Sequence, residues 1–254
     1  MSMSRHSNIL CLHGYRSDGK SFSNRTGSLR KPSRSFTNFI FIDAPHVVDE
    51  SSPTACYGWW QRDGDDLCGL EASIKYVLNY IATSDVPIDG LLGFSQGAAI
   101  VAIISTLLST DVRSPGFVFV NTSIKSVIRK PSFYLIFSGF LPYFDAFKDN
   151  TDIFESALKS SFPLSPSSLG KTGKSTSSST AVPIHLKGEL DSGQAVDVRT
   201  FHCYGLGDEQ VPADASRVLT RCFANPFVIY HEGGHYIPSV VKGEVKNFLK
   251  QFVF

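Results

Sequence analysis

Apolar residues along the chain fall into two patterns, short unbroken runs and longer stretches with helical spacing. The short runs are typical of buried strands and cover residues 8–13, 38–43, 88–93, 116–120, 133–138, 199–204 and 226–231. The longer stretches predict helices over residues 67–83, 96–109, 213–223 and 238–252. Strands that alternate with helices predict an α/β fold, with a mostly parallel sheet covered by helices on both faces.

One segment departs from this pattern. Residues 163–180 are rich in serine and almost without apolar side chains, so they cannot bury enough surface to fold. We therefore predict a disordered Ser-rich insertion at about residues 163–198, either a tolerated loop or a regulatory phosphorylation patch. The 254 residues fit one large α/β domain, and we expect a single domain over residues 1–254.

The charge and cysteine content argue against several functional classes. Lysine and arginine total 24 against 23 acidic residues, which gives no reason to expect nucleic acid or an anionic surface as a partner. The five cysteines show neither metal-ligand spacing nor even pairing, which favours a reducing compartment. No apolar run reaches the roughly 18 residues of a membrane helix, and no secretory signal is visible. We expect a cytoplasmic protein, or one that is also nuclear, without a membrane span.

Residues 93–97 read Gly-Phe-Ser-Gln-Gly and place Ser95 between a predicted strand and a predicted helix. In that position Gly-x-Ser-x-Gly is typical of the nucleophile elbow of an α/β-hydrolase. The turn is so tight that the residues flanking the serine need almost no side chain, and it exposes the hydroxyl at the carboxyl end of the sheet. A helix N-cap is the other interpretation of Ser95, because serine suits that site, but the two glycines favour the nucleophile.

Two titratable residues, Asp208 and His235, each come directly after a later predicted strand. Catalytic loops of such folds lie at that edge of the sheet. The order serine, acid, histidine along the chain is that of the α/β-hydrolases rather than of other serine hydrolases. Glu209 and His231 are the neighbouring alternatives for the acid and the base, and a solvated turn is the non-catalytic interpretation of Asp208.

Residues 14–21 carry a competing motif, Gly-x4-Gly-Lys-Ser, directly after an apolar strand. Residues 39–43 even resemble the strand and aspartate that hold magnesium in a P-loop NTPase. However, residues 22–31 are polar where the helix after a P-loop must pack an apolar face on the sheet, and they stop at Pro32. An NTPase also leaves the motif around Ser95 without a role, so we disfavour it.

Seven short stretches in a fixed order together resemble the fungal-type serine hydrolase (FSH) family, which belongs to the α/β-hydrolase superfamily and includes the human ovarian-tumour-associated hydrolase. The resemblance implies an α/β-hydrolase core and hydrolysis of carboxylic esters or thioesters without a cofactor or a metal. The related acyl-protein thioesterase family shares Gly-Phe-Ser-Gln-Gly, but the second and third stretches favour the first family. The stretches are Leu-Cys-Leu-His-Gly-Tyr-Arg (10–16), Asp-Ala-Pro-His (43–46), Gly-Trp-Trp (58–60), Gly-Leu-Leu-Gly-Phe-Ser-Gln-Gly-Ala (90–98), Phe-Ser-Gly-Phe (137–140), Gly-Asp-Glu-Gln-Val-Pro (207–212) and His-Glu-Gly-Gly-His (231–235).

The motifs and the resemblance together predict a Ser-His-Asp triad. Ser95 attacks an acyl carbonyl and forms an acyl-enzyme, and His235 takes the serine proton and later passes it to the leaving group. Asp208 accepts the other imidazole N–H and stabilises the imidazolium. The resemblance implies that the backbone N–H of Tyr15 points at the oxyanion. The N–H of Gln96 lies at the start of a predicted helix, a position that favours negative charge.

The predicted substrate is a small acyl ester or thioester, and the alternative function is a non-catalytic α/β-hydrolase fold that binds small molecules. His13 is interpreted as support for the oxyanion loop and Asp89 as a turn residue at the wrong end of its strand. Both tryptophans in the predicted pocket are equally consistent with plain core positions. The residues predicted to line an apolar acyl pocket are Trp59, Trp60, Phe140, Leu141 and Tyr143.

Overall fold

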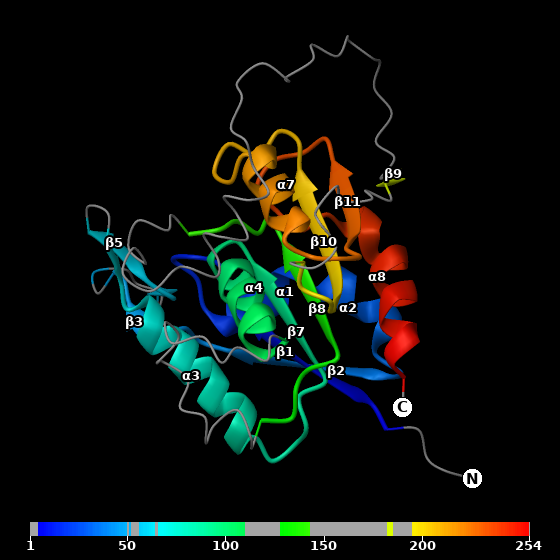
Figure 1. The fold of residues 1–254 in the computed structure, drawn as a ribbon, viewed down its shortest axis with the longest axis horizontal. Coiled ribbons are helices and arrows are strands. Elements are labelled where there is room, and N and C mark those ends of the chain that lie inside the picture. Colours follow the sequence, from blue (N-terminus) through cyan, green and yellow to red (C-terminus); the bar gives the residue numbers. More distant parts are fainter. Residues whose placement is uncertain are drawn as a thin grey trace.

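The computed structural model describes residues 5–49, 51, 56–63, 66–109, 128–142, 182–184 and 195–253. A twisted sheet runs through the middle of these residues, with helices on either side (Figure 1). In the described ranges it has seven strands in the order β2-β1-β7-β8-β10-β11-β9. Six strands are parallel and only the edge strand β9 is antiparallel, which confirms the predicted α/β sheet. The strands are β1 (Ser7–Leu12), β2 (Thr37–Ile42), β7 (Gly90–Phe94), β8 (Phe133–Phe137), β9 (Val182–Ile184), β10 (Arg199–Gly205) and β11 (Phe227–His231).

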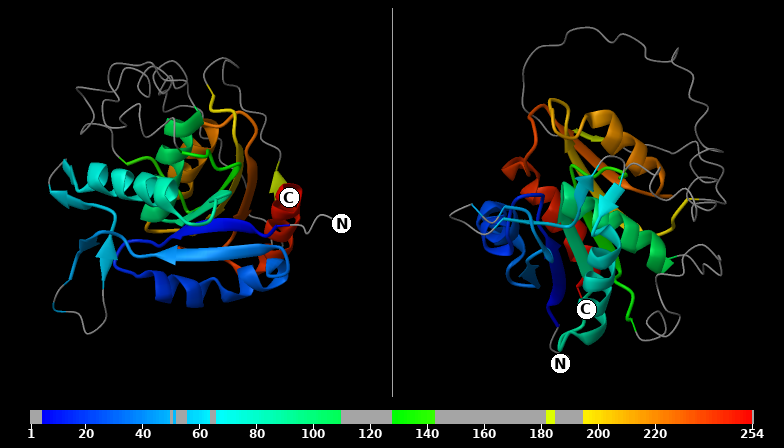
Figure 2. Two further views of the ribbon diagram at one scale, coloured as in Figure 1. Left: turned by 90° about the horizontal axis from the view of Figure 1, so that it is seen from below. Right: turned by 90° about the vertical axis from the view of Figure 1, so that its left-hand side faces the viewer.

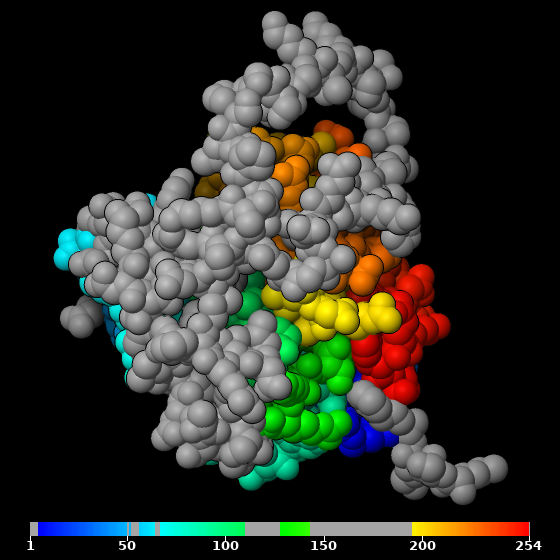
Figure 3. All heavy atoms as spheres, viewed as in Figure 1, coloured from blue at the N-terminus to red at the C-terminus, as the bar shows by residue number. Residues whose placement is uncertain are grey.

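Helices cover both faces of the sheet, as predicted (Figure 2). One face packs against α3 (Leu70–Thr83), α4 (Gln96–Ser109) and α7 (Ala213–Arg221). The other face packs against α1 (Gly19–Arg25), α2 (Gly27–Arg30) and α8 (Lys242–Leu249). Figure 3 shows the C-terminal segment, in red, beside the yellow segment at the start of β10. In the interior, the rings of Phe201 of β10 and Phe248 of α8 lie with centroids 5.6 Å apart.

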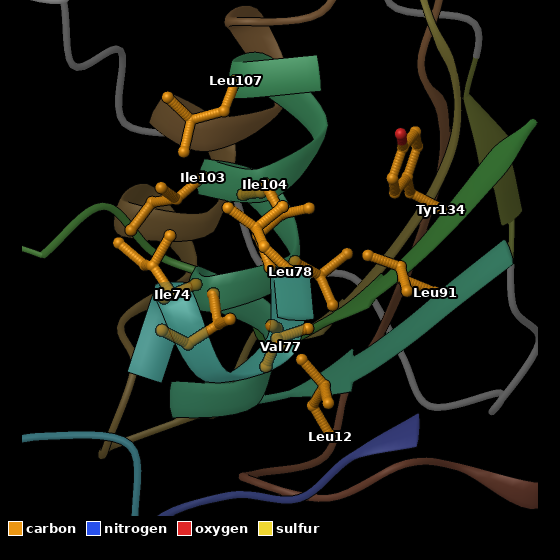
Figure 4. Packing of buried hydrophobic residues seen from close by; sticks show 14 of the residues in the cluster. Leu12, Ile74, Val77, Leu78, Leu91, Ile103, Ile104, Leu107 and Tyr134 are labelled. Atoms are coloured by element: carbon orange, nitrogen blue, oxygen red, sulfur yellow. The ribbon is translucent and has the colours of Figure 1, made fainter. Parts of the chain in front are cut away.

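The alternation of side chains along each strand divides the core into two layers. Leu10 and Leu12 of β1 point to the face of α4, whereas Ile9 and Cys11 point to the face of α8. Figure 4 shows Leu12 and Leu91 of the sheet directed toward Val77 and Leu78 of α3 and Ile104 of α4. Helix α4 is buried on nearly all sides because it lies between the sheet and α3, which explains its continuous apolar sequence.

Several element boundaries differ from the prediction for local reasons. The helix predicted from residue 67 begins at Leu70, because Gly69 adopts a left-handed φ of 89° and the preceding residues pair in a hairpin. The polar stretch 22–31, which we expected to be too polar for a packed helix, forms α1 and α2 on two buried residues, Phe22 and Leu29. Two apolar side chains therefore suffice to anchor a short helix pair.

Two small hairpins lie between β2 and α3 in the chain. Strands β3 (His46–Val47) and β4 (Tyr57–Gly58) form the first, and β5 (Gln61–Asp63) and β6 (Asp66–Cys68) form the second. Trp59 lies between the two hairpins and is fully buried. Short 3-10 turns flank the α2 and α8 helices at Lys31–Ser33, Ser239–Val241 and Lys250–Phe252.

Two sequence predictions lie mainly outside the described residues. The strand predicted at 116–120 lies entirely outside them, and the Ser-rich insertion predicted at about 163–198 lies mostly outside them. Within the range given for that insertion, Val182–Ile184 forms the edge strand β9 beside β11. No helix among the described residues is long and apolar enough to cross a membrane.

Candidate active site

The carboxyl ends of the parallel strands meet at one edge of the sheet, and the predicted catalytic residues follow them there. Register pairs Leu12 of β1 with Gly93 of β7, and Gly205 of β10 with His231 of β11. The loops that leave these strands therefore begin at nearly the same level. In α/β sheets this edge is where ligands bind.

Ser95 is the single residue between β7 and α4, and its φ of 54° lies in the left-handed region. Few residues other than glycine adopt this conformation, and the sharp strand-to-helix turn requires it here. Its backbone N–H donates to the Phe137 carbonyl at 2.9 Å. A Cβ at Gly93 would collide with the Gly97 carbonyl, and one at Gly97 would collide with the backbone of Leu12. Both flanking positions therefore have to be glycine.

Asp208 and His235 form a hydrogen-bonded pair on the loops after β10 and β11. The Nδ1 atom of His235 lies 2.7 Å from Oδ2 of Asp208, and the Asp208 side chain is fully buried while that of His235 is 9% exposed. The second carboxylate oxygen accepts the backbone N–H groups of Gln210 at 3.0 Å and Val211 at 2.8 Å. One oxygen thus holds the loop, and the other fixes the imidazole with Nε2 free to accept a proton.

Glu209 and His231, the neighbouring alternatives for the acid and the base, are not part of this hydrogen-bonded pair. Glu209 is exposed to solvent. His231 ends β11, and its Nδ1 accepts the backbone N–H of Gly233 at 3.2 Å. Burial lowers the pKa of His231, while the nearby Asp208 acts in the opposite direction. The structure therefore pairs Asp208 with His235 rather than Glu209 with His231.

The imidazole of His235 lies beside the elbow. Its ring centroid is 4.7 Å from that of Phe94, the residue directly before Ser95. The two loops that carry the pair are bonded to each other, because the N–H of Gly207 donates to the Gly233 carbonyl at 3.1 Å. The hydroxyl-bearing turn and the imidazole–carboxylate pair thus share one edge of the sheet.

The two predicted oxyanion amides belong to loops that flank Ser95. Tyr15 lies in the loop after β1, and Gln96 is the first residue of α4. The β1 loop touches the elbow, since a Cβ at Gly14 would be 3.3 Å from the Cβ of Ser95. The side chain of Tyr15 is 46% exposed, so this aromatic ring stands at the surface next to the site.

His13 is buried and uncharged, and it holds the β1 loop in place. Its Nε2 accepts the backbone N–H of Ala44 at 2.9 Å, and its Nδ1–H donates to the Gly14 carbonyl at 2.7 Å. Burial lowers the pKa of His13, which keeps the ring neutral. This arrangement agrees with the interpretation of His13 as support for the loop rather than as a catalyst.

The predicted pocket residues divide between core and rim. Trp59 is completely buried and its indole N–H donates to the His13 carbonyl at 2.7 Å, so the core interpretation holds for this tryptophan. Trp60 is 4% exposed, and its ring meets that of Phe140 edge to face with centroids 6.1 Å apart. Phe140 and Leu141 are half-buried after β8, whereas Tyr143 lies outside the described residues.

The serine hydrolase (FSH1) family model matches residues 2–246. The chain belongs to this family. The resemblance read from the seven sequence stretches is thereby confirmed. Esterase OVCA2 of Homo sapiens is 29% identical over 280 residues, which cover 99% of this serine hydrolase and 99% of the relative. Esterase CG5412 of Drosophila melanogaster is 29% identical over 259 residues, which cover 96% of the chain and 72% of the relative.

Solved structures resemble this serine hydrolase over nearly its full length. Acyl-protein thioesterase 2 of Zea mays superposes with a TM-score of 0.58 at 19% identity and covers 98% of this chain and 95% of its own. A carboxylesterase of Bacillus cereus gives a TM-score of 0.51 at 12% identity, with coverages of 97% and 88%. Identities this low establish the fold alone, which is that of the α/β-hydrolases.

In the P-loop-like segment 14–21 of this serine hydrolase, two backbone N–H groups and the serine hydroxyl are already bonded to carboxylates. The Asp18 carboxylate accepts the backbone N–H and the hydroxyl of Ser21, at 2.8 and 2.7 Å. The N–H of Gly19 donates to Asp43 at 2.7 Å. A phosphate there would have to displace two carboxylates and would meet their negative charge. Among the described residues there is also no group of three or more side chains that could hold a metal ion.

Sequence reasoning missed the side chain of Gln96. Its Oε1 accepts the backbone N–H of Trp59 at 2.8 Å, and its Nε2 donates to the Trp60 carbonyl at 2.9 Å. Gln96 is 7% exposed. No sequence pattern signals this contact, because its partners lie 37 and 36 residues earlier in the chain and are backbone groups.

Proposed function

We propose that this protein hydrolyses acyl esters or thioesters through Ser95, His235 and Asp208. The observation that carries the proposal is the 2.7 Å bond between a buried carboxylate and an imidazole that lies beside the serine-bearing turn. Membership in a serine hydrolase family and the names of the relatives, which are all esterases, support the same reaction class. The structural neighbours include both a thioesterase and a carboxylesterase.

In the first half-reaction the Ser95 hydroxyl attacks the acyl carbonyl carbon. His235 removes the hydroxyl proton through Nε2, and Asp208 stabilises the resulting imidazolium through Nδ1–H. The carbonyl oxygen becomes an oxyanion, which accepts hydrogen bonds from the backbone N–H groups of Tyr15 and Gln96. The tetrahedral intermediate collapses, the bond to the leaving group breaks, and His235 donates its proton to the departing alcohol or thiol.

In the second half-reaction a water molecule takes the place of the leaving group. His235 removes a proton from the water as it attacks the acyl-enzyme, and the same two amides hold the second oxyanion. Collapse releases the carboxylic acid and returns the proton to Ser95. The half-buried side chains of Phe140 and Leu141 offer an apolar wall for the acyl chain.

A reducing, cytoplasmic location belongs to the same proposal. None of the five cysteines is paired in a disulfide in the structure, which supports a compartment where disulfides do not form. Burial raises the pKa of the thiols of Cys11 and Cys203, so these two are inert core side chains rather than nucleophiles.

Labelling with a fluorophosphonate probe tests the nucleophile. Wild type and a Ser132→Ala control, which changes an exposed serine before β8, should both be labelled, whereas Ser95→Ala should not. p-Nitrophenyl esters and the matching thioesters, from short to long acyl chains, then define the preferred acyl length and leaving group. A well-folded wild type that neither reacts with the probe nor cleaves any substrate of the series would contradict the proposal and favour a small-molecule binder.

A further inference from the structure

A continuous chain of buried hydrogen bonds connects the two loops that carry the oxyanion amides. It runs from the Gln96 side chain to the backbone of Trp59 at 2.8 Å and from the Trp59 indole to the His13 carbonyl at 2.7 Å. It ends where His13 accepts the N–H of Ala44 at 2.9 Å. The Ser73 hydroxyl also donates to the Trp59 carbonyl, so that both backbone groups of Trp59 are bonded.

Every residue in this series of hydrogen bonds is uncharged and buried. Trp59, His13 and Ser73 are each 0% exposed and Gln96 is 7% exposed. Buried polar groups of this kind favour one arrangement strongly, because any other leaves a donor or acceptor without a partner and without water. These buried bonds therefore restrict the geometry of the two loops.

An oxyanion hole depends on the distance between donors that come from separate parts of the chain. Here one donor belongs to the loop after β1 and the other to the start of α4, and β1 and β7 pair in the sheet before these loops begin. Gln96 links the two donors, since its backbone N–H is one of the two proposed oxyanion donors and its side chain is bonded to Trp59 and Trp60, the segment that contacts the first loop.

We propose that the Gln96 side chain and the Trp59 indole are positioning residues that set the spacing of the two oxyanion donors. This inference rests on the proposed function and assigns a task to two side chains outside the triad. Trp59, one of the residues predicted to line the pocket, acts through the His13 carbonyl rather than by contact with the acyl chain.

Two variants remove one bond system each, Gln96→Met at nearly constant side-chain volume and Trp59→Phe with a smaller ring at the same buried position. Gln96→Met keeps an unbranched side chain of similar length but breaks both amide bonds, and Trp59→Phe keeps an aromatic ring but removes the N–H that reaches His13. Each should lower kcat by about tenfold to a hundredfold with little change in KM, less than the ~100- to 1000-fold loss for an oxyanion donor removed outright. Ser105→Ala is the matched control, because it removes an equally buried hydroxyl-to-carbonyl bond farther along α4.

Inhibition by an aliphatic trifluoromethyl ketone distinguishes a positioning role from a merely structural one, which would leave the Ki of the ketone unchanged. Its adduct with the serine carries an oxyanion, so its Ki should rise in each variant by about the factor that kcat/KM falls. Fluorophosphonate titration counts the folded sites, so that a loss of folded protein is separated from a loss of activity per folded site.

The outcomes separate this inference from the proposed function. A Ki and a kcat per titrated site equal to those of wild type in both variants would overturn the positioning role while leaving the hydrolase intact. If Gln96→Met does not fold, Trp59→Phe alone decides in the same way. A wild type that cleaves no ester and binds no ketone would instead overturn the proposed function itself.

Discussion

Two aspartates have fully buried carboxylates at opposite edges of the same sheet, and their partners differ in charge. Asp89 precedes β7 and binds the guanidinium of Arg5 at 2.9 and 2.7 Å and that of Arg129 at 3.2 Å. It also accepts the backbone N–H of Asn8 at 2.9 Å. Among the described residues, Asp208, which follows β10, binds two backbone N–H groups and the imidazole of His235.

The difference explains why one carboxylate is structural and the other suits catalysis. Arginine is permanently charged, so the charge of Asp89 is always neutralised and the ion pair simply ties the N-terminal strand to β7. Asp208 has no lysine or arginine partner in the described part of the chain. In the proposed mechanism its charge is compensated when His235 gains a proton, as Ser95 attacks.

The largest effect should come from Asp208→Asn. The amide nitrogen cannot accept the Nδ1–H of His235, so the imidazole turns or takes the wrong tautomer, and kcat should fall about 10³- to 10⁴-fold. The free energy of unfolding should change far less, because Asn can still accept the loop N–H groups through its oxygen. Steady-state ester hydrolysis and urea unfolding measure the two. A variant within tenfold of wild type would remove Asp208 from the triad.

Asp89→Asn should show the reverse pattern. It leaves two guanidiniums without their counter-charge, at a cost of about 2–3 kcal/mol in the free energy of unfolding, which is less than for a fully dry pair. The cost is reduced because the side chains of Arg5 and Arg129 are 37% and 56% exposed and can be hydrated. The rate per titrated site should stay within twofold of wild type. Equal stability with impaired catalysis would invert our assignment of the two aspartates.

His202 sharpens the comparison because it is buried without a counter-charge. Among the described residues its Nε2 has no hydrogen-bond partner and its ring has no counter-charge, and burial lowers the pKa of His202 to about 3. The unfolded chain, with a histidine pKa of about 6.5, binds the proton more readily, so stability is lost as the pH falls from about 6.5 toward 3.

His202→Leu should remove this acid sensitivity. The free energy of unfolding of the variant, relative to wild type, should rise by ~2 kcal/mol between pH 7 and pH 5, since each pH unit below about 6.5 is worth ~1.4 kcal/mol. Thr200→Val is the control, because Thr200 is equally buried on the same strand but cannot titrate. Parallel stability profiles for His202→Leu and wild type would show that His202 keeps its ordinary pKa in the folded protein.

The sequence predicted what depends on local pattern. The six parallel strands, α4 and the turn at Ser95 follow from apolar runs and two glycines, and parallel strands then bring Asp208 to His235. The environment of Asp89 could not be predicted, because Arg5 and Arg129 are 84 and 40 residues away. A lone aspartate before a strand looks the same whether it caps a turn or binds two arginines.

The smallest effect should come from Lys20→Ala, which tests the motif that competed with the elbow. In a P-loop this lysine contacts the phosphates and its loss is severe. Here Lys20 is exposed, and the neighbouring loop amides are already bonded to Asp18 and Asp43. Ester hydrolysis should stay within twofold of wild type, and isothermal titration should detect no ATP binding before or after the change. ATP binding that depends on Lys20 would assign the loop a function of its own, whereas its absence leaves the resemblance as a consequence of a glycine-containing turn after a strand.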